Sequence, residues 1–183
     1  MRHLGTKKLQ TERLILRRFT SDDYKDMFNN WASDSTVSRY LPWNAHKDEK
    51  ETQALLQKWV EEYKNADNYN WCIEYEGRAI GNIGVVAFDK NTKTAKTAYC
   101  IGTSFWGKGI VTEGYKAVLE FLFCKVGISK ISTSHDIRNI GSGRVMEKCG
   151  LKEVRTEKQT LKDENIVVSI KEITKEEFLS QNP

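Results

Sequence analysis

The sequence lacks a long apolar run, a paired cysteine motif and a cluster of histidines. Its apolar stretches are short, as at 85–88, and fall far below the roughly 18 residues that span a bilayer. The first ten residues are polar and basic, without the apolar segment of a secretory signal. We therefore expect a cytoplasmic protein that has no membrane partner.

Cysteine and histidine are both sparse. Four cysteines stand at positions 72, 100, 124 and 149, and none form a C-x-x-C pair. Their neighbours are apolar or typical of strands, so we expect buried, reduced thiols in a reducing compartment. The three histidines, at positions 3, 46 and 135, are scattered. Because a metal site needs ligands that lie together, the sequence predicts no metal cofactor.

Positive charge is in only small excess over negative charge. The 183 residues carry 29 Lys and Arg against 25 Asp and Glu, a net charge of +4. The basic residues are spread along the chain rather than gathered in a stripe, so we expect no direct nucleic-acid binding. The apolar fraction of 39% is enough for a core. We expect one domain over 1–183, since no linker, repeat or low-complexity segment interrupts it.

Hydrophobic periodicity predicts helices and strands in a defined order. Helical spacing of apolar residues predicts helices over about 20–32, 48–63, 111–126 and 139–149. Alternating patterns predict strands over about 13–18, 70–75, 79–88, 94–101, 130–134, 152–160 and 166–173. Helices followed by strands, then strands alternating with helices, predict an α/β fold of the α+β kind. Its mixed sheet would carry helices on both faces.

One glycine-rich segment lies between a predicted strand and a predicted helix. It reads Phe105-Trp106-Gly107-Lys108-Gly109-Ile110-Val111-Thr112-Glu113. The two glycines tolerate positive φ, so the chain can turn sharply and point several N–H groups into one concavity. The helix that follows adds unpaired amides and the positive end of its dipole. Such a turn binds a pyrophosphate, although a glycine-rich helix cap without a ligand has the same pattern.

Two common phosphate motifs do not fit this segment. The Walker loop fails because Ile110 follows Gly109. The dinucleotide fingerprint fails because Thr112 stands where its third glycine belongs. The segment instead resembles the Q/R-x-x-G-x-G/A loop of the GNAT superfamily of acetyltransferases. Residues 106–109 with Thr112 and Glu113 match the W-G-K-G-x-x-T-E version found in its ribosomal-protein (Rim-type) branch.

A second segment extends the resemblance. Residues 139–151 are similar to the N-x-x-S-x-R-V-x-x-K-x-G-F segment of that branch, and they begin thirty residues after Gly109. They also follow a predicted strand and open a predicted helix. Residues 11–17 and 39–43 resemble the N-terminal strand and the acceptor-side segment of the branch. The resemblance thus covers the chain from about 11 to about 178.

The resemblance implies the GNAT acyltransferase fold, whose central twisted sheet contains two splayed parallel strands. Here these would be 94–101 and 130–134, with the pantetheine of acetyl-CoA between them. It implies that main-chain groups of Cys100, Ile101 and Gly102 pair with pantetheine, and that the Ile101 amide stabilises the oxyanion. The other implied contacts with acetyl-CoA are those of Trp106, Gly107, Lys108, Gly109, Ile110, Val111, Thr112, Asn139, Ser142 and Arg144.

The proton donor for the CoA thiolate also follows from the resemblance. Many GNAT members use a tyrosine four positions before the helix-ending glycine, but Met146 stands there and cannot donate a proton. The Rim-type branch uses a serine, which implies a catalytic role for Ser142. A serine that only caps its helix would show the same pattern. Likewise, Arg144 fits either a phosphate contact or a solvated helix position.

No general base stands out. The strand positions at which many relatives carry a carboxylate are occupied by Lys96 and Ser132. Glu113 stands at a helix start, where a carboxylate complements the dipole. The remaining candidates are His135, Tyr99, Asp136, Asp163, Glu164 and a water relay without a single base. Two further departures from the family pattern are Val111 in the phosphate turn and Lys171 near a customary tyrosine.

We therefore expect an acetyl-CoA-dependent N-acetyltransferase, either a monomer or a homodimer. It would move the acetyl group to a primary amine, such as a protein N-terminus, by direct attack on the thioester. Two alternatives remain open. One is an acetyltransferase for small-molecule amines that serves detoxification. The other is a non-catalytic acyl-CoA-binding protein, which the missing strand carboxylates would favour.

Overall fold

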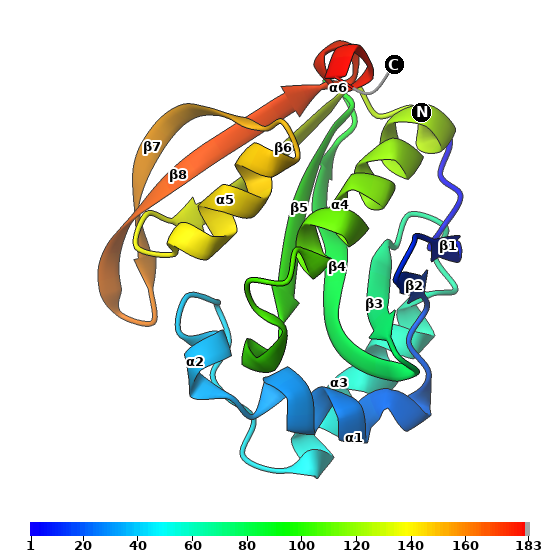
Figure 1. Ribbon diagram of the computed structural model, residues 1–183, viewed down its shortest axis with the longest axis vertical. Helices are drawn as coiled ribbons and strands as arrows, with labels where there is room; N and C mark the ends of the chain where they lie inside the picture. Colours follow the sequence, from blue (N-terminus) through cyan, green and yellow to red (C-terminus); the bar gives the residue numbers. More distant parts are fainter. Residues whose placement is uncertain (182–183) are drawn as a thin grey trace.

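The computed structural model describes residues 1–181, and one eight-stranded sheet runs through it (Figure 1). The strands lie in the order β1-β2-β3-β4-β5-β6-β8-β7. Their bounds are β1 Leu9–Gln10, β2 Leu14–Arg17, β3 Asn70–Tyr75, β4 Arg78–Asp89, β5 Thr94–Ile101, β6 Lys130–Asp136, β7 Lys152–Leu161 and β8 Glu164–Thr174. The helices are α1 Tyr24–Met27, α2 Ser35–Ser38, α3 Glu49–Glu62, α4 Ile110–Glu120, α5 Ile140–Lys148 and α6 Lys175–Gln181.

Short segments of tighter or wider helix extend these elements. A 3-10 turn over Ser21–Asp23 leads into α1, and another over Thr103–Phe105 follows β5. π-helical segments over Phe28–Ala32 and Phe121–Val126 continue α1 and α4. Gly127, at φ 82°, ends the second of them in the left-handed conformation that glycine favours after a helix.

The predicted α/β fold with a mixed sheet is confirmed. Helices cover both faces, with α4 and α5 on one side and α1 and α3 on the other (Figure 1). Tyr115 and Leu119 of α4 belong to the same buried cluster as Ile83 of the sheet. Trp31 and Leu56 belong to a second cluster together with Cys72. Among residues 1–181, no helix combines the length and the apolar character needed to cross a membrane.

Three short elements were not predicted. β1 has two residues and α2 has four, so neither contains a repeat of its pattern. The single turn of α2 begins where the Asp34 side chain accepts a hydrogen bond from the Thr36 amide at 2.7 Å. α6 has seven residues, of which Phe178 is buried against the main core.

The strands β5 and β6 are parallel, whereas every other neighbouring pair is antiparallel. Their register holds only from Thr94↔Lys130 to Lys96↔Ser132. Just beyond the last pair, the Thr133 hydroxyl donates to the Thr97 carbonyl at 2.8 Å. The two strands then continue without further pairing, so the splayed arrangement that the family resemblance implied is present.

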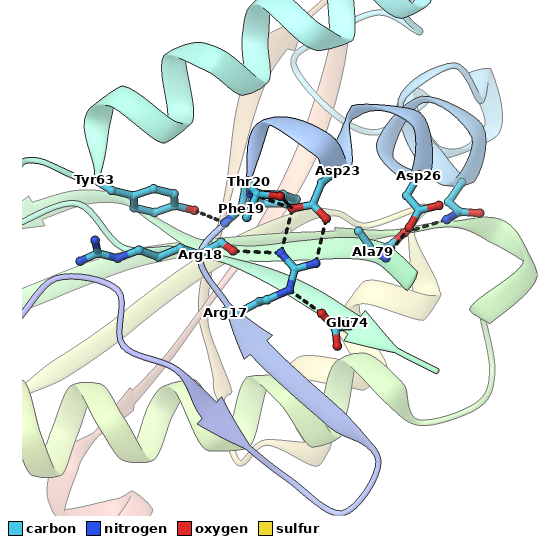
Figure 2. A network of polar contacts seen from close by, with 10 residues as sticks. Arg17, Arg18, Phe19, Thr20, Asp23, Asp26, Tyr63, Glu74 and Ala79 are labelled. Carbon is cyan, nitrogen blue, oxygen red and sulfur yellow. Dashed lines mark hydrogen bonds and ion pairs between the residues drawn. The ribbon is translucent and has the colours of Figure 1, made fainter. Parts of the chain in front are cut away.

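An ion-pair network ties β2 to its neighbours (Figure 2). The Arg17 guanidinium makes two 2.8 Å hydrogen bonds to the Asp23 carboxylate and also pairs with Glu74 of β3. Burial alone would raise the pKa of Asp23, but hydrogen bonds from Arg17 and the Thr20 amide outweigh it and lower that pKa. The network therefore fixes the start of α1 against β2 and β3.

A second set of contacts docks the first helical segment onto the end of the sheet. The Asp26 carboxylate accepts the Ala79 amide at 2.9 Å (Figure 2). The Asn30 side chain donates to the Ala79 carbonyl at 2.7 Å. The Asn30 main chain also approaches Gly102 so closely that a Cβ there would collide with the Asn30 carbonyl oxygen. Only glycine therefore fits at position 102, directly after β5. The segment that contains α1 and α2 thus lies beside the opening between β5 and β6.

Candidate active site

A cavity of about 640 Å³ opens where β5 and β6 diverge. Its walls are the C-terminal half of β5, the turn into α4, the end of β6 and the N-terminal part of α5. Val37, Tyr40 and Leu41, in and after α2, line one side. The volume lies within the range of small-molecule sites, roughly 300–1,000 Å³. The cavity therefore has the size and position expected for a substrate site between the splayed strands.

The turn between β5 and α4 presents unpaired amides to this cavity. Gly107 and Gly109 both have φ 74°, in the left-handed region that glycine adopts without steric cost. The first helical hydrogen bond of α4 runs from the Glu113 amide to the Gly109 carbonyl at 3.0 Å. The amides of 110–112 precede it and have no acceptor within the helix. Residues 106–109 are exposed, whereas Ile110 and Val111 are buried but line the cavity, so a ligand would reach this turn from the cavity side.

Most of the predicted acetyl-CoA contacts lie on the cavity wall. The wall contains Cys100, Ile101, Trp106, Gly107, Gly109, Ile110, Val111, Thr112, Asn139, Ser142 and Arg144. Gly102 and Lys108 are not part of it within the described chain. The Gly102 amide donates to the Ile80 carbonyl at 3.0 Å, while the Lys108 ammonium lies over the Phe105 ring, 5.5 Å from its centroid. Gly102 is thus present to allow close packing with Asn30.

Strand alternation decides which main-chain groups of β5 face the opening. The bond between Gly102 and Ile80 marks a hydrogen-bonded pair, so the next such pair is Cys100↔Asn82. Main-chain groups of Tyr99 and Ile101 therefore point away from β4 and toward β6. The Ile101 carbonyl accepts the Trp106 indole N–H at 3.0 Å, which leaves the Ile101 amide facing the opening.

Cys100 contributes a thiol that stays protonated. Burial raises the pKa of Cys100 to about 12. The thiol donates to the Asn82 side-chain oxygen at 2.9 Å. Its packing beside α1 and α3, within the second buried cluster, keeps it on the other face of the sheet from α5. Cys100 is therefore a packing residue of the cavity floor rather than a nucleophile.

The helix cap of α5 is Asn139. Its side-chain oxygen accepts the Ser142 amide at 3.2 Å, so Ser142 does not cap the helix. The Ser142 hydroxyl instead lies 3.1 Å from the Tyr99 hydroxyl on β5. Tyr99 also donates to the Ser142 carbonyl at 2.9 Å. The structure thus brings Ser142 to the opening with its hydroxyl engaged by a residue that the sequence analysis did not connect to it.

The carboxylates near the cavity are held in ion pairs. Arg138 hydrogen-bonds Asp136 and Glu164, with distances of 2.6 Å to each carboxylate. These bonds lower the pKa of both carboxyls, although burial opposes the shift in each case. Carboxylates with depressed pKa values are weak bases near neutral pH. Asp163, at φ 64° in the exposed turn between β7 and β8, does not line the cavity.

His135 and Tyr99 are uncharged near pH 7, unlike these carboxylates. Burial, reinforced by the charge of Lys171, lowers the pKa of His135, so its imidazole is neutral near pH 7. The ring packs beneath α5, where a Cβ at Gly143 would lie 2.7 Å from Nε2. Burial raises the pKa of Tyr99, which therefore keeps its proton. Lys96 and Ser132 face each other in the last registered pair of β5 and β6.

The connection between β1 and β2 braces the amide-bearing turn. The Glu113 carboxylate accepts the Thr11 hydroxyl at 2.6 Å and the Arg13 amide at 2.9 Å, and it pairs with the Arg13 guanidinium at 2.7 Å. Arg13 also donates to the Lys108 carbonyl at 3.1 Å. Burial would raise the pKa of Glu113, but the bonds from Thr11 and Arg13 lower it. Sequence reasoning identified Glu113 as structural but found no partner for it, because Arg13 is 100 residues away.

Removing the Glu113 charge tests this brace. We expect Glu113→Gln to weaken acetyl-CoA binding by about fivefold, since a partly exposed ion pair contributes on the order of 1 kcal/mol. The folded-state pKa of Glu113 is depressed, so its contribution to stability is present above about pH 4.5 and is lost as pH falls below that value. Chemical unfolding between pH 6 and 3 should therefore show a shallower acid loss of stability in the variant.

The matched control for this experiment is Glu120→Gln. Glu120 is exposed on the same helix, far from the turn. It should leave both acetyl-CoA binding and the acid dependence of stability unchanged. Equal effects of the two substitutions would contradict the proposed brace.

Comparison with known proteins agrees with this geometry. The model of the acetyltransferase (GNAT) domain matches residues 13–152. The Bacillus subtilis protein YoaA, described as an uncharacterized N-acetyltransferase, is 28% identical over 144 residues, which covers 78% of this chain and 81% of YoaA.

Solved structures share the fold at low sequence identity. The microcin C7 self-immunity acetyltransferase MccE, in complex with acetyl-CoA and AMP, has a TM-score of 0.81 at 16% identity, covering 90% of this chain and 93% of MccE. RimL, a ribosomal L7/L12 alpha-N-protein acetyltransferase, has a TM-score of 0.81 at 16% identity, covering 92% and 94%. The domain match spans most of the chain and confirms the family predicted from the two sequence segments. The chain therefore belongs to the GNAT family of N-acetyltransferases.

Proposed function

We propose that this enzyme transfers the acetyl group of acetyl-CoA to the α-amine of a protein or peptide N-terminus. One observation carries the proposal: the unpaired amides at the start of α4, the opening between β5 and β6, and Ser142 share one cavity. The family match supplies the reaction class. All four cysteines of the described chain are free thiols, which supports a reducing, cytoplasmic setting.

The turn from Gly107 to Thr112 fits a diphosphate. Gly107 and Gly109 carry no side chain that could occupy the concavity. The space beside Gly107 is open, because a Cβ built there would have no atom within 4 Å. The amides at the start of α4 and its dipole provide binding for negative charge without a fixed cation. In the proposed complex the diphosphate of acetyl-CoA accepts hydrogen bonds from these amides. The adjoining pantetheine then enters the opening between β5 and β6.

Transfer by direct attack needs few groups from the protein. The neutral amine attacks the thioester carbon, and the Ile101 amide is placed to donate to the oxyanion that forms. The C–S bond then breaks, and Ser142 protonates the departing thiolate. Neither step requires a covalent acetyl-enzyme.

The acceptor class is inferred from the weak bases around the site. Asp136 and Glu164 have lowered pKa values, so neither is suited to deprotonating an alkylammonium near pH 7. An α-amine has a pKa of about 7.7–8.0 and is already partly neutral there, whereas a lysine amine titrates near 10.4. The site is therefore better matched to N-terminal amines than to lysine side chains or polyamines.

An acceptor panel tests this function. The purified protein is incubated with acetyl-CoA and a peptide with a free N-terminus, the same peptide with a blocked N-terminus and an internal lysine, or spermidine. Thiol release gives the rate, and mass spectrometry locates the acetyl group. We expect transfer to the free N-terminus, with a rate that rises between pH 6.5 and 8.5. Transfer confined to lysine or spermidine would overturn the acceptor class, and absence of transfer to every amine would overturn the activity.

A further inference from the structure

The contact between Tyr99 and Ser142 carries a further inference, which rests on the proposed function. Tyr99 lies on β5, and Ser142 lies in the first turn of α5, across the opening. Both residues line the cavity. The Tyr99 hydroxyl is 2.9 Å from the Ser142 carbonyl oxygen and 3.1 Å from the Ser142 hydroxyl oxygen. One phenol group is therefore within hydrogen-bond distance of two oxygens of the same serine.

The proton of Tyr99 can serve only one of these oxygens at a time. A carbonyl oxygen can only accept, so Tyr99 donates to it in the resting arrangement. The Ser142 hydroxyl then donates to the Tyr99 oxygen, because that oxygen has free lone pairs. If Ser142 gives up its proton, Tyr99 can turn its own O–H toward the Ser142 hydroxyl oxygen. This exchange needs rotation of two O–H bonds, that of Ser142 from Tyr99 toward the thiolate and that of Tyr99 from the carbonyl toward the Ser142 oxygen. No heavy atom has to move.

The surroundings hold Tyr99 in place for this exchange. Its ring lies 5.2 Å from the ring of Tyr115, which is fully buried in α4. The Tyr115 hydroxyl is engaged elsewhere, 2.6 Å from the Thr97 hydroxyl. Burial raises the pKa of Tyr99, so it keeps its proton and does not act as an acid or a base itself.

We propose that Tyr99 is a positioning residue that orients the Ser142 hydroxyl and supports its proton donation to the CoA thiolate. As the C–S bond breaks, the Ser142 proton passes to sulfur, and the Tyr99 O–H turns to donate to the Ser142 oxygen. That oxygen regains a proton through water from the newly acylated nitrogen. The net reaction converts thioester and amine to thiol and amide, and Tyr99 ends with the proton it began with.

A double-mutant cycle tests the inference on the full chain. We expect Tyr99→Phe to lower kcat by about tenfold while KM for acetyl-CoA changes less than twofold, because both hydrogen bonds between Tyr99 and Ser142 are lost. Since Tyr99 acts through Ser142, adding Tyr99→Phe to Ser142→Ala should lower kcat no further than Ser142→Ala alone. Tyr115→Phe is the matched control: it removes a neighbouring tyrosine hydroxyl that hydrogen-bonds Thr97 and not Ser142. It should leave kcat within twofold of the wild type.

Thermal unfolding and acetyl-CoA calorimetry on every variant separate loss of fold from loss of function. Multiplicative effects of Tyr99→Phe and Ser142→Ala would overturn the positioning role, as would a Tyr99→Phe effect that appears only in KM. If the wild-type protein transfers acetyl groups and Tyr99→Phe is as active as Tyr115→Phe, this inference is overturned and the proposed function stands. A wild-type protein that transfers no acetyl group to any amine would overturn both.

Discussion

Acetyl-CoA binding should weaken by at least about 100-fold when Gly109 is replaced by valine. Gly109 has φ 74° and is the N-cap of α4. A non-glycine residue in this left-handed region costs roughly 1–2 kcal/mol, and a β-branched side chain is the least tolerated there. Relief of the strain would turn the amides of the loop away from the diphosphate. The loss of 100-fold corresponds to about 2.8 kcal/mol, which calorimetry with acetyl-CoA measures directly.

The control for this substitution is Gly77→Val. Gly77 also has φ 74°, and a Cβ there would have nothing within 4 Å. It lies in the turn between β3 and β4, outside the cavity wall. Gly77→Val should therefore lower the melting temperature through the same backbone strain while acetyl-CoA binding stays within twofold. If Gly109→Val retained wild-type affinity, side chains rather than main-chain amides would have to hold the diphosphate.

Replacing Ser142 with alanine should lower kcat by about 100-fold, with little change in KM for acetyl-CoA. Proton transfer from a positioned side chain typically contributes 10²–10⁴-fold to a rate. The helix cap of α5 is made by Asn139, so the substitution should leave the helix intact. Steady-state thiol release with a peptide acceptor provides the measurement.

Two further variants make the Ser142 result specific. Ser142→Cys retains a proton donor and should recover part of the lost rate. Ser104→Ala removes an exposed serine from the 3-10 turn after β5, outside the cavity wall, and should leave kcat unchanged. A Ser142→Ala variant with kcat within threefold of the wild type would show that water protonates the thiolate without this residue.

Local pattern was enough to predict the elements that frame the site. The strands 70–75 and 94–101 have the predicted bounds, because alternation and flanking turn residues act within a few positions. The helix start predicted near Val111 lies one residue earlier, at Ile110. Gly107 and Gly109 both adopt the left-handed conformation that their spacing indicated. The amide-bearing turn could thus be predicted from nine consecutive residues.

Contacts between distant residues could not be predicted in the same way. The hydrogen bond of Tyr99 to Ser142 joins residues 43 positions apart, and it depends on how far β5 and β6 diverge. The family resemblance implied that Gly102 pairs with pantetheine. The structure shows that its amide bonds to Ile80 and that Asn30 packs against it. These contacts arise where the sheet packs against the helices on its two faces, and the spacing of residues along the sequence does not predict them.

Even within the short N-x-x-S segment, the sequence did not predict which residue caps the helix. Asn139 and Ser142 are both good cap residues, so the pattern alone allows either one to begin the helix. The structure assigns the cap to Asn139 and leaves the Ser142 hydroxyl facing Tyr99. The interpretation of Ser142 as a helix cap is therefore wrong, and its catalytic role stays a prediction.

An amide-resolved NMR titration with acetyl-CoA tests most directly whether main-chain N–H groups hold the diphosphate. We predict that the amides of Gly107, Gly109, Ile110, Val111 and Thr112 show the largest downfield proton shifts as the site fills. The same five amides should move little with acetyl-pantetheine, which lacks the diphosphate. Saturation by acetyl-CoA with these amides unmoved would contradict the account.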